Sequence, residues 1–318
     1  MTNDPGETFL PEITGGSLGG HRDHFAGLRV TFLNESVDAP DEVAWLLYDE
    51  PDVIEGEAES DLPGGLEALL TRHDPALVRA LAISGYGASH APGVLAAYAD
   101  RLPGLRSVFL GLAEAEQWEI SWIRQGDITP LLEAYPRLER LEVRGSQGLE
   151  LRPFAHDHLR VLRFETGGLP PEVVRALGAS TFPALEHLEL WLGVEEYGGG
   201  ATVADLEGVL SGVGTPALRR LGLRDSPIQD DIAAAVAAAP VVTRLEELSL
   251  GMGALTDRGA EALLSGQPLT HLRRLDLRHH HLGEEMMTRV RQALPGVEVD
   301  LEEARFEPGE WTYVAVSE

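Results

Sequence analysis

Residues 218–223 read Leu-Arg-Arg-Leu-Gly-Leu, and this short pattern decides the fold. It recurs 27 residues later as Leu-Glu-Glu-Leu-Ser-Leu at 245–250, and again 27 residues later as Leu-Arg-Arg-Leu-Asp-Leu at 272–277. Further copies of the same six-residue frame occur upstream, at 185–190, 159–164, 138–143 and 105–110, with a weaker copy at 78–83. Eight copies in order at nearly constant spacing indicate a chain built from stacked structural units.

The frame, numbered here from its first leucine, also predicts what each unit contains. Positions four and six are two residues apart, so in an extended strand both side chains point into the core, while positions three, five and seven point the other way. Helix-start signals follow the strands, such as Ser226-Pro227 with Gln229, and Thr256-Asp257. We therefore predict a strand, a turn and a helix in each unit, including a helix from about Ser226 to Ala239.

These copies resemble leucine-rich repeats, and the match covers residues 78–301. The resemblance implies an α/β solenoid, with a curved parallel sheet on the concave side and helices on the convex side. Residues 1–77 would form an N-terminal tail and capping segment, with strands at 28–33 and 43–48, and residues 302–318 a C-terminal capping tail. The chain departs from the family at position nine, because none of the eight copies has asparagine there.

Several strings go beyond the generic repeat. Residues 119–123 read Glu-Ile-Ser-Trp-Ile, residues 189–193 read Glu-Leu-Trp-Leu-Gly, and the chain ends Tyr-Val-Ala-Val-Ser-Glu at 313–318. Together they resemble a family of bacterial, especially actinobacterial, cytosolic leucine-rich-repeat proteins of unassigned function. This resemblance implies a fold and a cellular compartment, and it transfers no catalytic residue.

Composition excludes several classes of protein. The 318 residues include 52 acidic side chains, 25 basic ones that are all arginine, and no cysteine, which gives a net charge of -27. Such a charge repels nucleic-acid phosphates and anionic lipids, so we expect neither nucleic acid nor membrane as a partner. Without cysteine there are no disulfides and no thiolate metal sites. The N-terminal residues lack a secretory signal pattern, so we expect a cytoplasmic protein.

Positions three, five and seven form one face, which in a solenoid is the concave one; we call it the strand face. Across the eight copies it carries seven arginines and five carboxylates. Arginine recognises carboxylates with two hydrogen bonds, and arginine and tryptophan often dominate binding energy. We therefore predict a non-catalytic scaffold that binds a protein or peptide with exposed carboxylates, through Arg140, Glu142, Arg144, Arg163, Glu165, His187, Glu189, Trp191, Arg220, Arg224, Arg274 and Arg278.

A simpler interpretation of the same residues stays open. Alternating charges on neighbouring strands can pair with one another in solvent, each pair contributing less than about 1 kcal/mol to stability. In that case the strand face would need no ligand.

An alternative function comes from the last repeat, where His279, His280 and His281 precede Glu284 and Glu285. These residue types suit an accessory enzyme or a metal-binding protein. Adjacent residues of an extended segment, however, point alternately outward and inward, so we expect His280 to be the turn residue at position nine. No catalytic motif accompanies the histidines. We therefore predict neither catalysis, nor a cofactor, nor a metal site.

Overall fold

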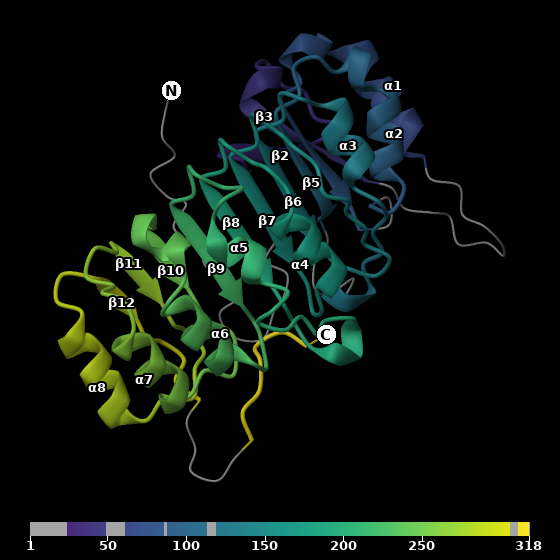
Figure 1. Ribbon diagram of the computed structural model, residues 1–318. Helices are drawn as coiled ribbons and strands as arrows, with labels where there is room; N and C mark the ends of the chain where they lie inside the picture. The colour runs from purple at the N-terminus through teal and green to yellow at the C-terminus, as the bar shows by residue number, and fades with distance from the viewer. Residues whose placement is uncertain (1–23, 49–60, 86–87, 113–118, 306–310, 318) are drawn as a thin grey trace. The chain divides into compact units, whose positions relative to one another are not determined.

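The computed structural model describes residues 24–48, 61–85, 88–112, 119–305 and 311–317 (Figure 1). The chain divides into two compact units. The N-terminal unit extends to Arg152 and includes 156–162, and the C-terminal unit comprises 153–155 and the chain from Arg163 onward. Within each unit, the strands follow one another through the sheet in chain order, and the sheet is open.

The N-terminal unit contains a parallel sheet that begins with one antiparallel pair. Its strands are β1 (His24–Phe25), β2 (Leu28–Phe32), β3 (Val43–Leu47), β4 (Ala80–Ser84), β5 (Ser107–Leu112) and β6 (Arg140–Arg144). The strands predicted at 28–33 and 43–48 are thereby confirmed. Figure 1 shows three helices side by side along this sheet, α1 (Leu62–Arg72), α2 (Ala91–Ala97) and α3 (Thr129–Ala134).

The C-terminal unit repeats the same pattern more regularly. β7 (Val161–Glu165) lies at the division, and the parallel strands that follow are β8 (His187–Trp191), β9 (Arg220–Arg224), β10 (Glu247–Ser249), β11 (Arg274–Asp276) and β12 (Glu298–Asp300). A helix follows each strand from β7 to β11, namely α4 (Pro171–Gly178), α5 (Glu207–Ser211), α6 (Gln229–Val236), α7 (Asp257–Ser265) and α8 (Glu284–Ala293). Figure 1 shows α6 and α7 side by side.

The core confirms the assignment of positions four and six. Leu221, Leu223, Leu248 and Leu250 are completely buried, and the equivalent residues of the other repeats are at most 2% exposed. Each fully buried aliphatic side chain stabilises the fold by about 1.5–3 kcal/mol. Two such side chains per strand, repeated along the chain, form a continuous apolar layer between sheet and helices.

The helix predicted over 226–239 is shorter than expected. The Ser226 side chain accepts a hydrogen bond from the amide of Ile228, which forms a turn, and α6 begins only at Gln229. The helix ends at Val236, before a 3-10 turn that starts at Pro240. The start predicted at Thr256 is confirmed, because its side chain accepts a hydrogen bond from the Arg258 amide and caps α7.

Side chains other than asparagine tie the turns together. Gln229 donates its amide N–H to the Leu223 carbonyl, and Gln125 donates to the Arg144 carbonyl. Thr166 donates its hydroxyl to the Trp191 carbonyl of the following repeat. Each bond satisfies a backbone group at the end of a strand, which is the need that an asparagine ladder would meet.

Candidate binding face of the C-terminal unit

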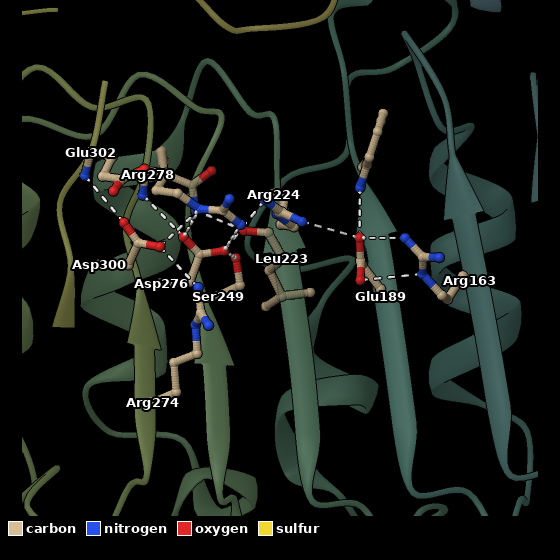
Figure 2. A network of polar contacts seen from close by, with 12 residues as sticks. Arg163, Glu189, Leu223, Arg224, Ser249, Arg274, Asp276, Arg278, Asp300 and Glu302 are labelled. Atoms are coloured by element: carbon tan, nitrogen blue, oxygen red, sulfur yellow. Dashed lines mark hydrogen bonds and ion pairs between the residues drawn. The ribbon is translucent and has the colours of Figure 1, made fainter. Parts of the chain in front are cut away.

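The strand face of the C-terminal unit is crossed by a continuous network of ion pairs (Figure 2). Its first centre is the fully buried carboxylate of Glu189 on β8. Arg163 approaches Glu189 through two nitrogens, at 3.3 and 3.1 Å, and Arg224 donates to it at 3.2 Å. Trp191 donates its indole N–H at 2.8 Å, and His187 Nε2 lies 3.3 Å away. One carboxylate thus holds side chains from three neighbouring strands.

The second centre is Asp276 on β11, which is also fully buried. Arg278 donates its Nε–H and its backbone amide to Asp276, at 3.0 and 3.1 Å, and Ser249 donates its hydroxyl at 2.9 Å. Arg224 joins the two centres, because its other terminal nitrogen lies 3.4 Å from Asp276 Oδ2. The network therefore extends from β7 to β11 through Arg224.

Small residues explain how Arg224 reaches so far. Gly222 on β9 is the register partner of both Glu189 on β8 and Ser249 on β10. Because Gly222 has no side chain, nothing on β9 stands between the side chains of these two residues. Neighbouring strands lie about 4.8 Å apart, so the two strand spacings from β9 to β11 are about 10 Å. An extended arginine covers this distance only if nothing large stands on β10, where Ser249 and Gly251 occupy positions five and seven.

At the C-terminal end of the sheet, β12 contributes acids that balance the last arginines. Arg274 contacts Glu298 at 3.2 Å and Asp300 at 2.8 Å, and Asp300 also lies 3.2 Å from Arg278. Arg220 lies 3.4 Å from Glu247 on β10. The side chain of Arg220 is 33% exposed, against 15% for Arg274 and 10% for Arg278.

In the N-terminal unit, the strand face carries a separate pair. Arg140 donates to Glu142 at 2.9 Å, and Glu142 is 1% exposed. Arg144 is buried, with its guanidinium 5.9 Å from the centre of the Phe109 ring. In the C-terminal unit, Glu165 pairs with Arg163 at 3.1 Å.

The environment shifts the pKa values of the network. Burial alone would raise the pKa of Glu189, but Arg163 and the hydrogen bond from His187 lower it to about 2. Burial likewise opposes ionisation of Asp276, yet Arg224 and Arg278 hold its pKa below the ordinary value. Burial lowers the pKa of Arg224 to about 10, so this guanidinium is charged at neutral pH. Both carboxylates are therefore ionised at neutral pH.

These contacts correct two expectations. The simpler interpretation places the charges of the strand face in solvent, but all twelve predicted residues except Arg140, Arg220 and Arg274 are buried. We also expected an excess of positive charge. In the C-terminal unit the face carries five arginines and seven carboxylates, because the β12 repeat adds Glu298, Asp300 and Glu302 at positions three, five and seven. The cross-strand pairs of the simpler interpretation do form, but within the protein and not in solvent.

The sequence interpretation missed Asp276 and Asp300 as members of the site. Asp276 was placed on the strand face without a role, because spacing alone does not show that Arg224 reaches over β10. The frame does not identify Asp300, because position one of its repeat is Gly296 where the other repeats have leucine or valine. Continuing the alternation of Val299 and Leu301 in the frame of β11 would have placed it at position five, as its pairing with Asp276 shows.

The histidines of the last repeat contact backbone groups. His280 Nδ1 accepts from the Leu282 amide, and its Nε2 lies 3.2 Å from the Leu301 carbonyl, which suits the turn residue we expected. His279 and His281 both lie near the Tyr313 carbonyl. In the part of the chain that the structure describes, no group of three histidine or acidic side chains could hold a metal ion.

Comparison with known proteins agrees with this architecture. Residues 243–264 and 269–285 match a family model described as leucine rich repeat. A crystal structure of a protein from Bacteroides fragilis is similar at 26% identity and a TM-score of 0.71, over 79% of this chain and 73% of that one. The fold is a leucine-rich-repeat fold.

Weaker similarity extends to two other solved structures. An internalin from Listeria monocytogenes is 14% identical with a TM-score of 0.39, over 84% of this chain and 70% of that one. A TLR13–ssRNA13 complex is 17% identical with a TM-score of 0.30, over 72% and 36%. No curated protein sequence matches the chain. Among the described residues, no helix has the length and apolar character needed to cross a bilayer.

Proposed function

We propose that this protein is a non-catalytic scaffold that binds a protein or peptide through the strand face of its leucine-rich repeats. Repeat proteins with this fold present an extended face that suits macromolecular partners. We also propose that the protein is cytoplasmic and that it belongs to the family of bacterial, especially actinobacterial, leucine-rich-repeat proteins that its sequence resembles.

Arg220 carries the proposal, because the network leaves it the most exposed arginine of the strand face. Its side chain is one-third exposed, and its Nε lies 3.4 Å from Glu247 Oε1. In the described residues, Glu247 Oε2 and Arg274 Nε are buried without a hydrogen-bond partner. Buried polar atoms in this condition are rare in proteins and are often satisfied by a ligand or water. A partner carboxylate supplies acceptors of the kind that Arg220 and Arg274 Nε need, and the partner's backbone N–H groups are donors of the kind that Glu247 Oε2 lacks.

The buried network has a supporting role in this proposal. Arg163, Glu189, Arg224 and Asp276 form ion pairs with one another and hold the face rigid, so that little conformational entropy is lost on binding. Three of the predicted contacts, Arg140, Glu142 and Arg144, lie in the N-terminal unit and are proposed as a second contact area.

Selection of acidic peptides on the full chain by phage display tests the role of Arg220. We expect Arg220→Ala to weaken binding of the selected peptides by at least about 10-fold, since a lost charge-assisted hydrogen bond costs about 1.5–3 kcal/mol. Arg219→Ala is the matched control: Arg219 is the preceding residue, is 45% exposed and contacts Glu246 instead. Equal loss in the two variants, or none in either, would contradict a binding role for Arg220.

A further inference from the structure

The described C-terminal segment, residues 311–317, lies across the turns that follow three successive strands of the C-terminal unit. Ala315 donates its amide to the Met252 carbonyl at 2.7 Å, and Val316 donates its amide to Asp225 Oδ1 at 2.9 Å. Tyr313 donates its amide to His281 Nε2 at 3.2 Å. A segment remote in sequence thus contacts the repeats of β9, β10 and β11 in turn.

The residues that receive the segment share one unusual feature. Asp225, Met252 and His279 occupy frame position eight of their repeats, and all three have positive φ angles, of 56°, 68° and 53°. This left-handed conformation is unfavourable for most residues other than glycine. Glu303, at the same position of the β12 repeat, has it as well, so it is a regular feature of these turns, and the contacts with residues 311–317 are what distinguish Asp225, Met252 and His279. We call Asp225, Met252 and His279, together with His281, the turn edge.

The turn edge is built to receive main-chain groups. Asp225 is completely buried, and its Oδ1 accepts the Val316 amide while its Oδ2 has no hydrogen-bond partner among the described residues. The rings of His279 and His281 stand edge-on to the Tyr313 ring at 5.4 and 5.2 Å. Burial of a carboxylate opposes stability unless donors are supplied, and here the extended segment supplies one of them, the Val316 amide.

The segment itself is weakly anchored. Only Val314 and Val316 are buried, at 8% and 2% exposure, while Trp311 is 93% exposed and Tyr313 is 49% exposed. Burial of two valine side chains does not outweigh the conformational entropy lost when seven residues are ordered. Main-chain hydrogen bonds, two valines spaced two residues apart and the Tyr313 ring are the features that the turn edge recognises.

We propose that the turn edge is a binding site for an extended peptide segment with the spacing Val-x-Val, and that residues 311–317 occupy it as an exchangeable ligand in cis. The competing occupant is a partner protein's extended segment with the same spacing. Recognition uses the main chain, the two valine side chains and the Tyr313 ring, so the identity of the other residues matters little. This site is distinct from the strand face, so its failure would leave the proposed function intact.

A labelled peptide tests the exchange. The probe is a fluorescein-labelled synthetic peptide with the sequence of residues 311–318, titrated by fluorescence anisotropy onto the full chain carrying Val314→Ser and Val316→Ser. We expect binding at least about 10-fold tighter than to the wild type, whose own segment is present at an effective concentration on the order of millimolar. A peptide with serine at both valine positions is the control. Equal affinities for variant and wild type, or for the two peptides, would overturn the proposal.

Substitutions at Asp225 test the contact itself. In the same full-chain variant, Asp225→Ala removes the acceptor and should weaken the labelled peptide about 5-fold, whereas Asp225→Asn keeps an oxygen acceptor and tolerates the left-handed backbone. Indistinguishable affinities in these two variants would overturn the role of Asp225.

Amide hydrogen exchange measured on the wild-type protein tests the same proposal without variants, so a folding defect in a variant cannot affect the result. If residues 311–317 exchange as a ligand, the amides of Ala315 and Val316 should lose protection about 100-fold faster than the buried amide of Leu250, because they open locally. Equal protection would show that the segment is a permanent part of the fold, and would overturn the proposal.

Discussion

Replacement of Glu189 by alanine should destabilise the C-terminal unit by about 5 kcal/mol, at the upper end of the range for a broken buried ion pair. The reason is the number of groups that lose a partner. Arg163 and Arg224 are 2% and 0% exposed, and both would keep a buried charge without this carboxylate. Trp191 would also lose the acceptor of its indole N–H. Urea unfolding of the full chain, followed by circular dichroism, measures the change.

The exposed Glu186 on the preceding turn provides a matched control. It lies three residues before Glu189, and Glu186→Ala should change the free energy of unfolding by at most about 0.5 kcal/mol. The pH dependence gives a second check. The folded pKa of Glu189 is about 2, below its ordinary 4.5, so its stabilisation is complete above pH 4.5 and disappears as the pH falls through 2. The difference in the free energy of unfolding between wild type and Glu189→Ala should therefore become smaller as the pH falls toward 2. A difference that does not change with pH would contradict this account.

Asp276→Asn should destabilise the same unit by about 3 kcal/mol, at the lower end of that range. Asparagine keeps the shape and one acceptor, but it removes the charge that faces Arg224 and Arg278. The loss is smaller than at Glu189, since Asp300 still lies 3.2 Å from Arg278. Urea unfolding again measures it.

Asp231→Asn is the control for this prediction. Asp231 forms an ion pair at 2.8 Å with Arg258, but both side chains are more than half exposed. Solvent screens such a pair, and its removal should change stability by less than about 1 kcal/mol. A larger effect at Asp231 than at Asp276 would show that burial does not determine the strength of these pairs.

The repeat frame was enough to predict the architecture. Position alone identified Leu221, Leu223 and their equivalents as core residues, because a strand buries alternate side chains whatever its neighbours are. Boundaries were less accurate: the helix expected from Ser226 begins at Gln229, since the Ser226 hydroxyl forms a local turn.

The candidate site was only partly predictable. Spacing placed Arg224 and Glu189 on one face, but their contact depends on the parallel register and on the absence of a side chain at Gly222. The contact of Arg224 with Asp276 needs the small residues of β10 as well. Burial of the face could not be predicted from a periodicity that assigns positions three, five and seven to solvent.

The turn edge shows a different limit. The sequence predicts a C-terminal capping tail over residues 302–318, but it does not say which repeats the tail contacts. In the structure, residues 311–317 are an irregular segment that reaches back as far as Asp225, in the repeat of β9. No local pattern marks Asp225, Met252 and His279 as left-handed residues, because none is glycine or asparagine.

The central claim is that the strand face of the C-terminal unit is a coupled, buried ion-pair network. A double-mutant cycle on Arg163 and Glu189 tests it most directly, because the cycle isolates the energy of their contact. Urea unfolding of wild type, Arg163→Met, Glu189→Gln and the double variant should give a coupling energy of about 2–3 kcal/mol, with the double variant more stable than the sum of the single changes predicts. Additive effects, with a coupling energy below about 0.5 kcal/mol, would contradict the network.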